Sequence, residues 1–131
     1  MDIAVDTSVL LAVCINEPSK PRLIELTAGH ALVAPASLHR EVGNALSAML
    51  KRERLTLQQA QICVAAYQQI PIKLISVDLS QALAISARQR MYAYVAYVLV
   101  CPMHSRTPLI TLDGPLKIAA RHLGITLLEV E

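Results

Sequence analysis

The chain has 131 residues and a formal net charge of +2 at pH 7, so its size is that of one ordinary domain. Hydrophobic residues make up 54% of the sequence, without any Phe or Trp, so the chain can bury a core that is largely aliphatic. The small positive charge permits an RNA partner but does not indicate one. Asp2 and Asp6 interrupt the first apolar run, and the uncharged apolar segment 91–105 is too short to span a bilayer. We therefore expect a cytoplasmic protein.

The cysteines and histidines indicate neither a disulfide framework nor a zinc site. The three cysteines, Cys14, Cys63 and Cys101, are far apart and lie in apolar runs. The four histidines have no metal-ligand spacing among themselves or with the cysteines. We expect buried free thiols in a reducing compartment.

Short apolar runs alternate with helical patterns from one end of the chain to the other. Strands are expected at 3–5, 30–34, 73–75, 109–113 and 125–130, and helices from 9 onward, from 18 to about 28, from 38 to a solvated end at 51–54, from 57 to about 69, from a cap at Asp78 or Ser80 through 87, at 91–101 and at 116–122. Strands that alternate with helices form a parallel sheet with helices on both faces. The prediction is a single α/β domain over 1–131, a three-layer sandwich with a five-stranded parallel sheet.

Two of the expected strands end in an aspartate that is followed by a helix. Asp6 follows the first strand, and Asp113 ends the fourth. Ligands bind at the carboxyl ends of the strands in open α/β sheets, so the two carboxylates converge if these strands are neighbours. For Asp6 the alternative is that it only caps the next helix, although Thr7 or Ser8 is also a good N-cap.

Glu41 and Asn44 are three residues apart on the long expected helix and share a face beside its apolar stripe. A carboxylate near the core needs a partner, because an unpaired buried charge is costly. Several carboxylates around one point suit a hard cation such as Mg²⁺ or Mn²⁺. The alternative is a surface glutamate that pairs with Arg40 or His39.

Three short motifs resemble, in the same order, those of PIN-domain proteins. They are the segment Val5–Ala12, the segment Glu41–Leu46, which is similar to a Glu-x-x-Asn-Ala-Leu motif, and the segment Pro108–Asp113, which is similar to a Thr-x-Asp motif. The resemblance covers the whole chain, and the branch that it looks most like is that of the VapC toxins of bacterial toxin–antitoxin pairs. It implies a PIN-like sheet with strand order 3-2-1-4-5, in which the first and fourth strands are neighbours.

The function that the resemblance implies is a metal-dependent endoribonuclease, the toxin component of a type II toxin–antitoxin system. Its catalytic and metal-binding acids correspond to Asp6, Glu41 and Asp113, which would hold Mg²⁺ or Mn²⁺. Asp6 and Asp113 would bind the ion directly, and Glu41 would bind it through water or orient the attacking water. Supporting polar residues are implied at Thr7, Asn44 and Thr111.

The resemblance also implies a protein antitoxin and a homodimer. We expect the dimer to use apolar helical surface that includes Tyr92, Tyr94 and Tyr97, although each tyrosine could equally be a core or pocket residue. A cluster of carboxylates is an attractive site for an arginine of the antitoxin. Candidates for contacts with RNA phosphates are Lys51, Arg52, Arg54, Arg88, Arg90, Arg106, Lys117 and Arg121. We expect no aromatic-interleaved basic stretch of the kind that stacks single-stranded bases.

One position departs from the family pattern. The family usually has a further acid, within a Tyr-Asp-Ala pattern, on the helix before the fourth strand, and the matching stretch Tyr94–Tyr97 has Val95 in its place. No Asp or Glu lies between Leu79 and Asp113, and the nearest upstream acid, Asp78, is expected to be a helix N-cap. We expect the missing ligand to weaken the metal site and the activity.

Three other functions fit parts of the sequence. A PIN-like protein that lost catalysis through Val95 would still bind an antitoxin or RNA. A receiver-like domain would accept a phosphoryl group on Asp6 or Asp113, although the paired acids at the start of its first helix and a lysine after its fifth strand are missing. The third alternative is a structural α/β module that binds no metal.

Overall fold

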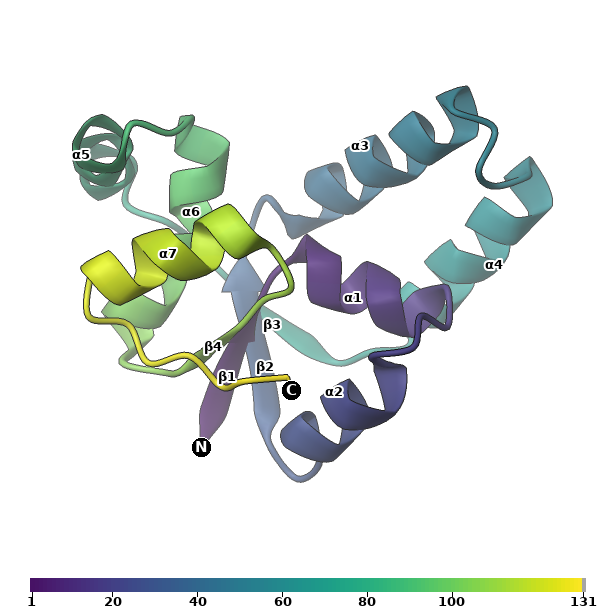
Figure 1. The fold of residues 1–131 in the computed structure, drawn as a ribbon, viewed down its shortest axis with the longest axis horizontal. Helices are drawn as coiled ribbons and strands as arrows, with labels where there is room; N and C mark the ends of the chain where they lie inside the picture. Colours follow the sequence, from purple (N-terminus) through teal and green to yellow (C-terminus); the bar gives the residue numbers. More distant parts are fainter. Residues whose placement is uncertain (131) are drawn as a thin grey trace.

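The computed structural model describes residues 1–130, and its centre is a parallel sheet between two groups of helices (Figure 1). The strands are β1 (Asp2–Val5), β2 (Ala31–Pro35), β3 (Ile72–Ile75) and β4 (Leu109–Ile110). Their order across the sheet is β3-β2-β1-β4, and every pairing is parallel. Since β1 lies between β2 and β4, the expectation that the first and fourth strands are neighbours is confirmed.

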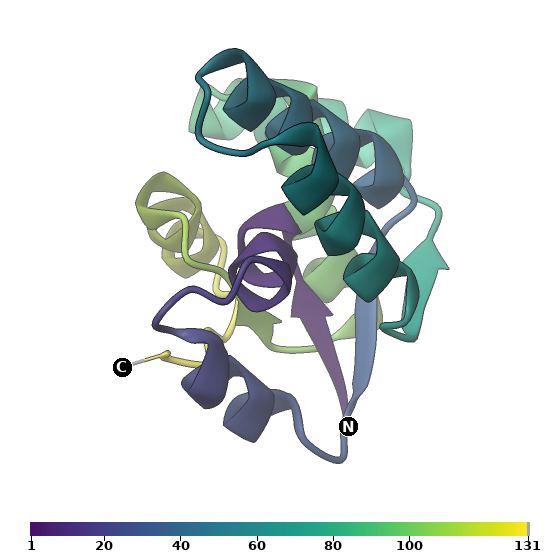
Figure 2. The same ribbon diagram turned by 90° about the vertical axis from the view of Figure 1, so that its right-hand side faces the viewer.

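The helices divide between the two faces of the sheet. Along β1, Ile3 and Val5 belong to one buried cluster and Ala4 to another, because successive side chains of a strand point to opposite faces. The first cluster is completed by α1 (Thr7–Cys14), α2 (Lys20–Thr27), α3 (Leu38–Lys51) and α4 (Leu57–Gln68), and the second by α5 (Leu79–Gln89), α6 (Ala93–Ser105) and α7 (Gly114–His122). Figures 1 and 2 show these two groups on either side of the sheet, so the chain has three layers.

The expected fifth strand at 125–130 does not form, and the prediction of a five-stranded sheet is wrong. The segment runs beside β4 but makes only one isolated bridge, between Leu109 and Leu127. Both of its hydrogen bonds to β4 use Leu109, whose N–H donates to the Thr126 carbonyl and whose carbonyl accepts from the Leu128 N–H. Along a parallel strand, alternate residues bond to the same neighbour. Because β4 has only two residues, it offers one residue to this edge, which makes a bridge and not a ladder.

The fourth strand is shorter than expected because, beyond Ile110, backbone N–H groups donate to side-chain hydroxyls and not to a neighbouring strand. The Leu112 N–H donates to the Ser8 hydroxyl at 3.0 Å, and the Asp113 N–H donates to the Thr111 hydroxyl at 3.1 Å. The backbone after Ile110 is therefore directed into the junction with α7 instead of continuing along β1.

Two helix starts differ from the sequence prediction. Asp6 is the N-cap of α1, as in the alternative stated for it, and Thr7 and Ser8, the other candidates, lie within the helix. Ser37 precedes α3 as expected but makes no capping hydrogen bond, and its hydroxyl donates to Glu41 instead. Ser8 and Ser37 are both of a residue type that favours helix N-caps. In the structure their hydroxyls instead donate to the carboxylates of Asp6 and Glu41.

The expected N-caps of α4 and α5 are confirmed. Thr56 caps α4 with a complete capping box, and Asp78 caps α5. The three cysteines are free, with Cys63 and Cys101 buried and Cys14 half-buried. Within residues 1–130, none of the helices combines the length and the apolar character that crossing a membrane requires.

Candidate functional site

Asp6 lies at the carboxyl end of β1 and is almost completely buried, with 7% of its surface exposed. The hydroxyls of Ser8 and Thr111 donate to its two carboxylate oxygens, each at 2.6 Å. The Val9 N–H, in the first turn of α1, donates at 3.3 Å to the oxygen that Ser8 also contacts. All of these donors are neutral, and Asp6 forms no ion pair within residues 1–130. Asp6 is therefore a buried acid without a cationic partner.

Asp113 lies in the junction between β4 and α7, three residues after Ile110, and its side chain is exposed. Its carboxylate accepts from the Leu116 N–H at 3.0 Å and caps α7. Thr111, which is 1% exposed, connects the two acids, because its hydroxyl donates to Asp6 and accepts from the Asp113 N–H. Asp6 and Asp113 thus lie at the same edge of the sheet, linked by one buried hydroxyl.

Glu41 lies in the first turn of α3 and is half-buried. Its carboxylate accepts from the Ser37 hydroxyl at 3.0 Å. The alternative of an ion pair with Arg40 or His39 is not observed, and His39 is hydrogen-bonded to the Tyr67 hydroxyl. Within the described residues, Glu41 therefore has no cation beside it either.

The pKa shifts of these acids report their environment. Burial raises the pKa of Asp6, the hydrogen bonds from neutral donors lower it, and the negative charge of Asp113 raises it further. Burial also raises the pKa of Glu41, the Ser37 hydrogen bond opposes this, and the negative charge of Asp6 adds to it. Since each acid is influenced by the next, the three share one region of negative potential.

The implied supporting residues differ in their relation to the acids. Thr111 contacts Asp6 directly. Thr7 is half-buried and Asn44 is exposed, and the hydrogen bonds to the three acids within residues 1–130 come from other groups. The structure therefore brings Thr111 into the site and leaves Thr7 and Asn44 without a described role there.

Ser8 is a residue of the site that the sequence-based assignment missed. Its hydroxyl donates to Asp6 and accepts from the Leu112 N–H at 3.0 Å, so it ties the start of α1 to the segment after β4. The signal in the sequence was the pair of hydroxyl residues directly after Asp6. Which of them turns back toward the acid depends on the first turn of α1 and on the neighbouring strand, and neither is visible in the spacing.

The donor chemistry of the three acids fits a hard divalent cation, but their arrangement is not that of a complete metal centre. Carboxylate oxygens are the ligands that Mg²⁺ and Mn²⁺ prefer, and no cation neutralises Asp6, Glu41 or Asp113 within residues 1–130. In the same part of the chain, no group of three or more His, Cys, Asp or Glu side chains is placed to hold one metal ion. Their carboxylate oxygens instead accept hydrogen bonds from protein groups. Glu41 accepts from the Ser37 hydroxyl, Asp6 from the Ser8 and Thr111 hydroxyls, and Asp113 from a backbone N–H in the first turn of α7.

Val95 lies where the resemblance to PIN-domain proteins implies an acid, and it lines a cavity that Asp113 also lines. This cavity, which we call the Asp113 cavity, has a volume of about 410 Å³ and is lined by the end of α5, the start of α6, the residues between these helices, Asp113, and residues along the length of α7. Val95 is half-buried and packs against the core of the second face. A carboxylate at position 95 would therefore open onto the same space as Asp113.

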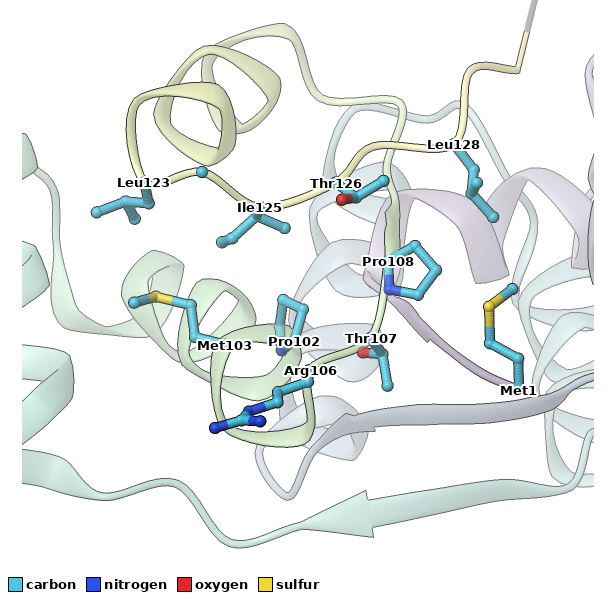
Figure 3. A pocket seen from close by; sticks show the side chains of 11 residues that line it. Met1, Pro102, Met103, Arg106, Thr107, Pro108, Leu123, Ile125, Thr126 and Leu128 are labelled. Carbon is cyan, nitrogen blue, oxygen red and sulfur yellow. The ribbon is translucent and has the colours of Figure 1, made fainter.

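A larger cavity, of about 620 Å³, lies at the amino-terminal ends of β1 and β4, away from Asp6 (Figure 3). Met1 and Pro108, which line it, precede β1 and β4, whereas Asp6 and Thr111 follow these strands. Figure 3 shows mostly apolar side chains around it. The Thr107 hydroxyl at its wall is buried and has no hydrogen-bond partner within residues 1–130, but solvent does not reach it. The larger cavity thus offers few polar groups to a ligand, and its size does not mark the functional site.

Comparisons with known proteins identify the fold and leave the family open. No protein-family model matches the chain, and no curated protein sequence matches it. Among solved structures, PAE2754 from Pyrobaculum aerophilum is similar over 91% of this chain and 79% of its own, with a TM-score of 0.70 and 20% identity.

Two further solved structures match nearly the whole chain. One is VapBC2 from Rickettsia felis bound to a DNA fragment from their promoter, with a TM-score of 0.65, 14% identity and 98% of both chains covered. The other is FitAcB from Neisseria gonorrhoeae, with a TM-score of 0.66, 14% identity, and 98% of this chain and 97% of that chain covered. At these identities the likeness concerns the fold, and membership of the PIN-domain family stays a prediction.

Proposed function

We propose that this chain is a metal-dependent endoribonuclease and the toxin component of a type II toxin–antitoxin pair. The observation that carries the proposal is the junction of β1 and β4, where the Thr111 hydroxyl links Asp6 and Asp113 across two adjacent parallel strands. The motifs that resemble VapC toxins lie at this junction and on α3, and the similarity to the VapBC2 and FitAcB structures supports the same class.

The strand order argues against the receiver-like alternative. Receiver-type domains have the order 2-1-3-4-5, whereas here β1 lies between β2 and β4 and β3 is at the edge. The phosphoacceptor hypothesis therefore loses the fold on which it depended.

In the proposed reaction, Asp6 and Asp113 would hold one Mg²⁺ or Mn²⁺ ion, and Glu41 would bind it through water or orient the attacking water. Thr111 and Ser8 orient the Asp6 carboxylate, and because both are neutral they leave its negative charge available to a cation. Such an ion supplies Lewis-acid polarisation of the scissile phosphate and lowers the pKa of bound water. Burial raises the pKa of Asp6 and of Glu41, and a cation bound between them would lower both pKa values again by stabilising the negative charge.

The experiment compares the wild-type chain with Asp6→Asn, Glu41→Gln and Asp113→Asn. Binding of Mn²⁺ is followed by titration calorimetry, and cleavage of a cellular RNA preparation is followed with Mn²⁺ and with EDTA. Each substitution should lower Mn²⁺ affinity and cleavage by about 10–100-fold or more, since even a residue that only supports a metal ligand has an effect of this size.

The matched control is Asp78→Asn, because Asp78 is also an exposed aspartate that caps a helix, α5. It should change neither measurement. Cleavage that persists in EDTA, or that the three acid substitutions do not affect, would overturn the proposal.

A second candidate is a PIN-like protein without catalysis that binds an antitoxin or RNA. It is favoured by Val95 at the expected acid position and by the lack, within residues 1–130, of a complete group of metal-binding side chains. The absence of Mn²⁺-dependent cleavage by pure wild-type protein, together with retained partner binding, would select this candidate.

The proposal includes a protein antitoxin that places a basic or apolar segment against the three acids, and a homodimer. An arginine suits a group of carboxylates without cations. Co-expression with the product of the adjacent gene, followed by pull-down, tests the first point. Binding that survives the combined substitution of Asp6, Glu41 and Asp113 would show that the acids are not the docking point. Light scattering tests the dimer, and a monomer at high micromolar concentration would exclude it.

A further inference from the structure

Aromatic and cationic side chains gather at the Asp113 cavity, contrary to the expectation from the sequence. Arg90 and Tyr92, between α5 and α6, line the cavity, and His122 at the end of α7 lines it from the other side. Tyr94 does not line it, but its ring is stacked on that of Tyr92, with a centroid distance of 6.0 Å and an interplanar angle of 13°. The stretch from Arg88 to Tyr94 is therefore a basic-aromatic surface segment.

The Tyr92 side chain is largely exposed to solvent, although its ring is stacked on that of Tyr94. It is 77% exposed and Tyr94 is 58% exposed, so most of the Tyr92 side chain remains available for contact. Its position beside Tyr94 already restricts the ring, so a flat ligand that stacks on it orders little additional side chain. An exposed aromatic ring of this kind is a stacking platform for the bases of single-stranded nucleic acid.

The charges around Tyr92 are suited to a polyanion. Arg90 and His122 are exposed, and neither forms an ion pair within residues 1–130. Arginine contacts phosphate and also stacks on planar groups. Asp113, one of the proposed metal ligands, lines the same cavity, so a strand held at Tyr92 would lie beside the acids.

We propose that Tyr92 is a base-stacking subsite for single-stranded RNA, with Arg90 and His122 as phosphate contacts, and that it delivers the strand to the acids through the Asp113 cavity. This inference rests on the proposed function, because it names the substrate form and the path to that site. Stacking on an aromatic ring is tolerant of base identity, so the subsite selects for unpaired bases more than for a particular sequence.

The same surface is less suited to self-association. A two-fold dimer places the same patch of both copies in contact, which here would bring together two Arg90 guanidinium groups, neither of which forms an ion pair within residues 1–130. The patch is also hollowed by the Asp113 cavity, whereas the centre of a dimer interface is closely packed and poor in charge. Self-association through Tyr92 is nevertheless a defined outcome of the test below.

The experiment measures RNA binding in EDTA, so that it does not depend on metal binding or cleavage. The probes are fluorescein-labelled oligouridylate and oligoadenylate, and an abasic ribose-phosphate oligomer of the same length, followed by anisotropy. The chain has four tyrosines and no tryptophan, so quenching of intrinsic tyrosine fluorescence reports base stacking directly. Variants are Tyr92→Leu, Tyr92→Phe and Arg90→Gln, and the control Ile62→Ala removes another largely exposed apolar side chain, from α4.

Tyr92→Leu should weaken binding of both base-containing probes by about tenfold or more and reduce the quenching. Tyr92→Phe keeps the ring and should stay within about twofold of the wild type. Arg90→Gln should weaken binding of all three probes and reduce the salt dependence by about one phosphate contact. Tyr92→Leu should leave binding of the abasic probe unchanged, and Ile62→Ala should change nothing.

Three results would overturn the subsite. They are a wild-type chain that binds no single-stranded probe, a Tyr92→Leu variant that binds like the wild type, and a Tyr92→Leu variant whose oligomeric state is smaller by light scattering, which would assign the ring to a dimer interface. The outcome is separate from that of the proposed function. If Tyr92→Leu weakens RNA binding but the wild type shows no Mn²⁺-dependent cleavage, the subsite is supported and the nuclease proposal is wrong. If the wild type cleaves RNA but Tyr92→Leu does not weaken binding, the nuclease proposal is supported and the subsite is wrong.

Discussion

The junctions β1–α1 and β4–α7 have the same local design and different environments. In each, a parallel strand is followed by an aspartate whose carboxylate accepts from a backbone N–H three residues later and caps the next helix. Asp6 is buried and receives two hydroxyl hydrogen bonds in addition to the cap. Asp113 is exposed and lines a cavity.

The difference follows from the positions of the two strands in the sheet. β1 is a central strand, so α1 and the end of β4 cover its carboxyl end. β4 is paired with β1 and otherwise has only the single bridge to Leu127, so the turn that follows it is open to solvent. One sequence signal thus yields a buried carboxylate in one place and an exposed carboxylate in the other, and the proposed metal site would need both.

The largest expected effect on stability comes from breaking the link between the two junctions. Thr111→Val keeps the shape of the side chain but removes the donor to the buried Asp6 carboxylate and the acceptor for the Asp113 N–H. We expect a loss of about 2–3 kcal/mol in the free energy of unfolding, as is typical for a hydrogen bond to a charged group. Urea denaturation measures it.

The matched control for this loss is Thr126→Val, because Thr126 is exposed. It should change the free energy of unfolding by less than about 0.5 kcal/mol. Equal effects of the two substitutions would mean that the buried hydroxyl does not support Asp6.

The second prediction strengthens the exposed side of the comparison. Val95→Asp adds a carboxylate to the cavity that Asp113 lines, so Mn²⁺ affinity and RNA cleavage should rise by about tenfold or more. Without metal, the added negative charge should lower the melting temperature. Titration calorimetry, the cleavage assay and melting with and without Mn²⁺ measure these effects.

Val95→Asn is the control for the second prediction, because it has the shape of aspartate without the charge. It should give little increase in affinity. An unchanged Mn²⁺ affinity in Val95→Asp would show that position 95 is an ordinary packing residue and that the alignment of α6 with the family pattern is wrong.

The third prediction separates the capping role of Asp113 from its proposed metal role. In EDTA, Asp113→Ala should lower the free energy of unfolding by about 1 kcal/mol, the usual value of an N-cap. Asp78→Ala should have a similar effect, because Asp78 caps α5 in the same way. With Mn²⁺, only Asp113→Ala should lose the stabilisation that the ion provides. A much larger effect of Asp113→Ala in EDTA would indicate that this junction is as tightly packed as that of Asp6.

The smallest expected effect is a pH dependence of the metal-free protein. Burial raises the pKa of Asp6 and of Glu41 above their ordinary values of 3.8 and 4.5, so the folded chain binds more protons than the unfolded chain between the ordinary and the raised value. Stability therefore falls as the pH rises through this window. Melting temperatures in EDTA, taken as the difference between wild type and Asp6→Asn at each pH, isolate the contribution of Asp6. A difference that grows in favour of the wild type as the pH rises would contradict the sign of this shift.

Much of the fold and part of the candidate site were predictable because their signals are local. The alternation of apolar runs with helical patterns indicates a parallel sheet covered on both faces, and the caps at Thr56 and Asp78 depend on bonds within one turn. The placement of Asp6 and Asp113 after strands is also a local property. That these two strands are adjacent in the sheet was implied by the family resemblance and not by the local pattern.

The tertiary structure alone decided how deeply each of these acids is buried and which groups hydrogen-bond to it. The hydrogen bond from Thr111 to Asp6 joins residues 105 apart in the chain, and the role of Ser8 and the burial of Asp6 depend on the same meeting of β1 and β4. The same side chains explain the missing fifth strand. Ser8 and Thr111 accept from the backbone after Ile110, so β4 ends after two residues and is too short to pair with a further strand. Spacing along the chain reports which groups are available, whereas burial and charge are set by groups that the fold brings together from distant positions.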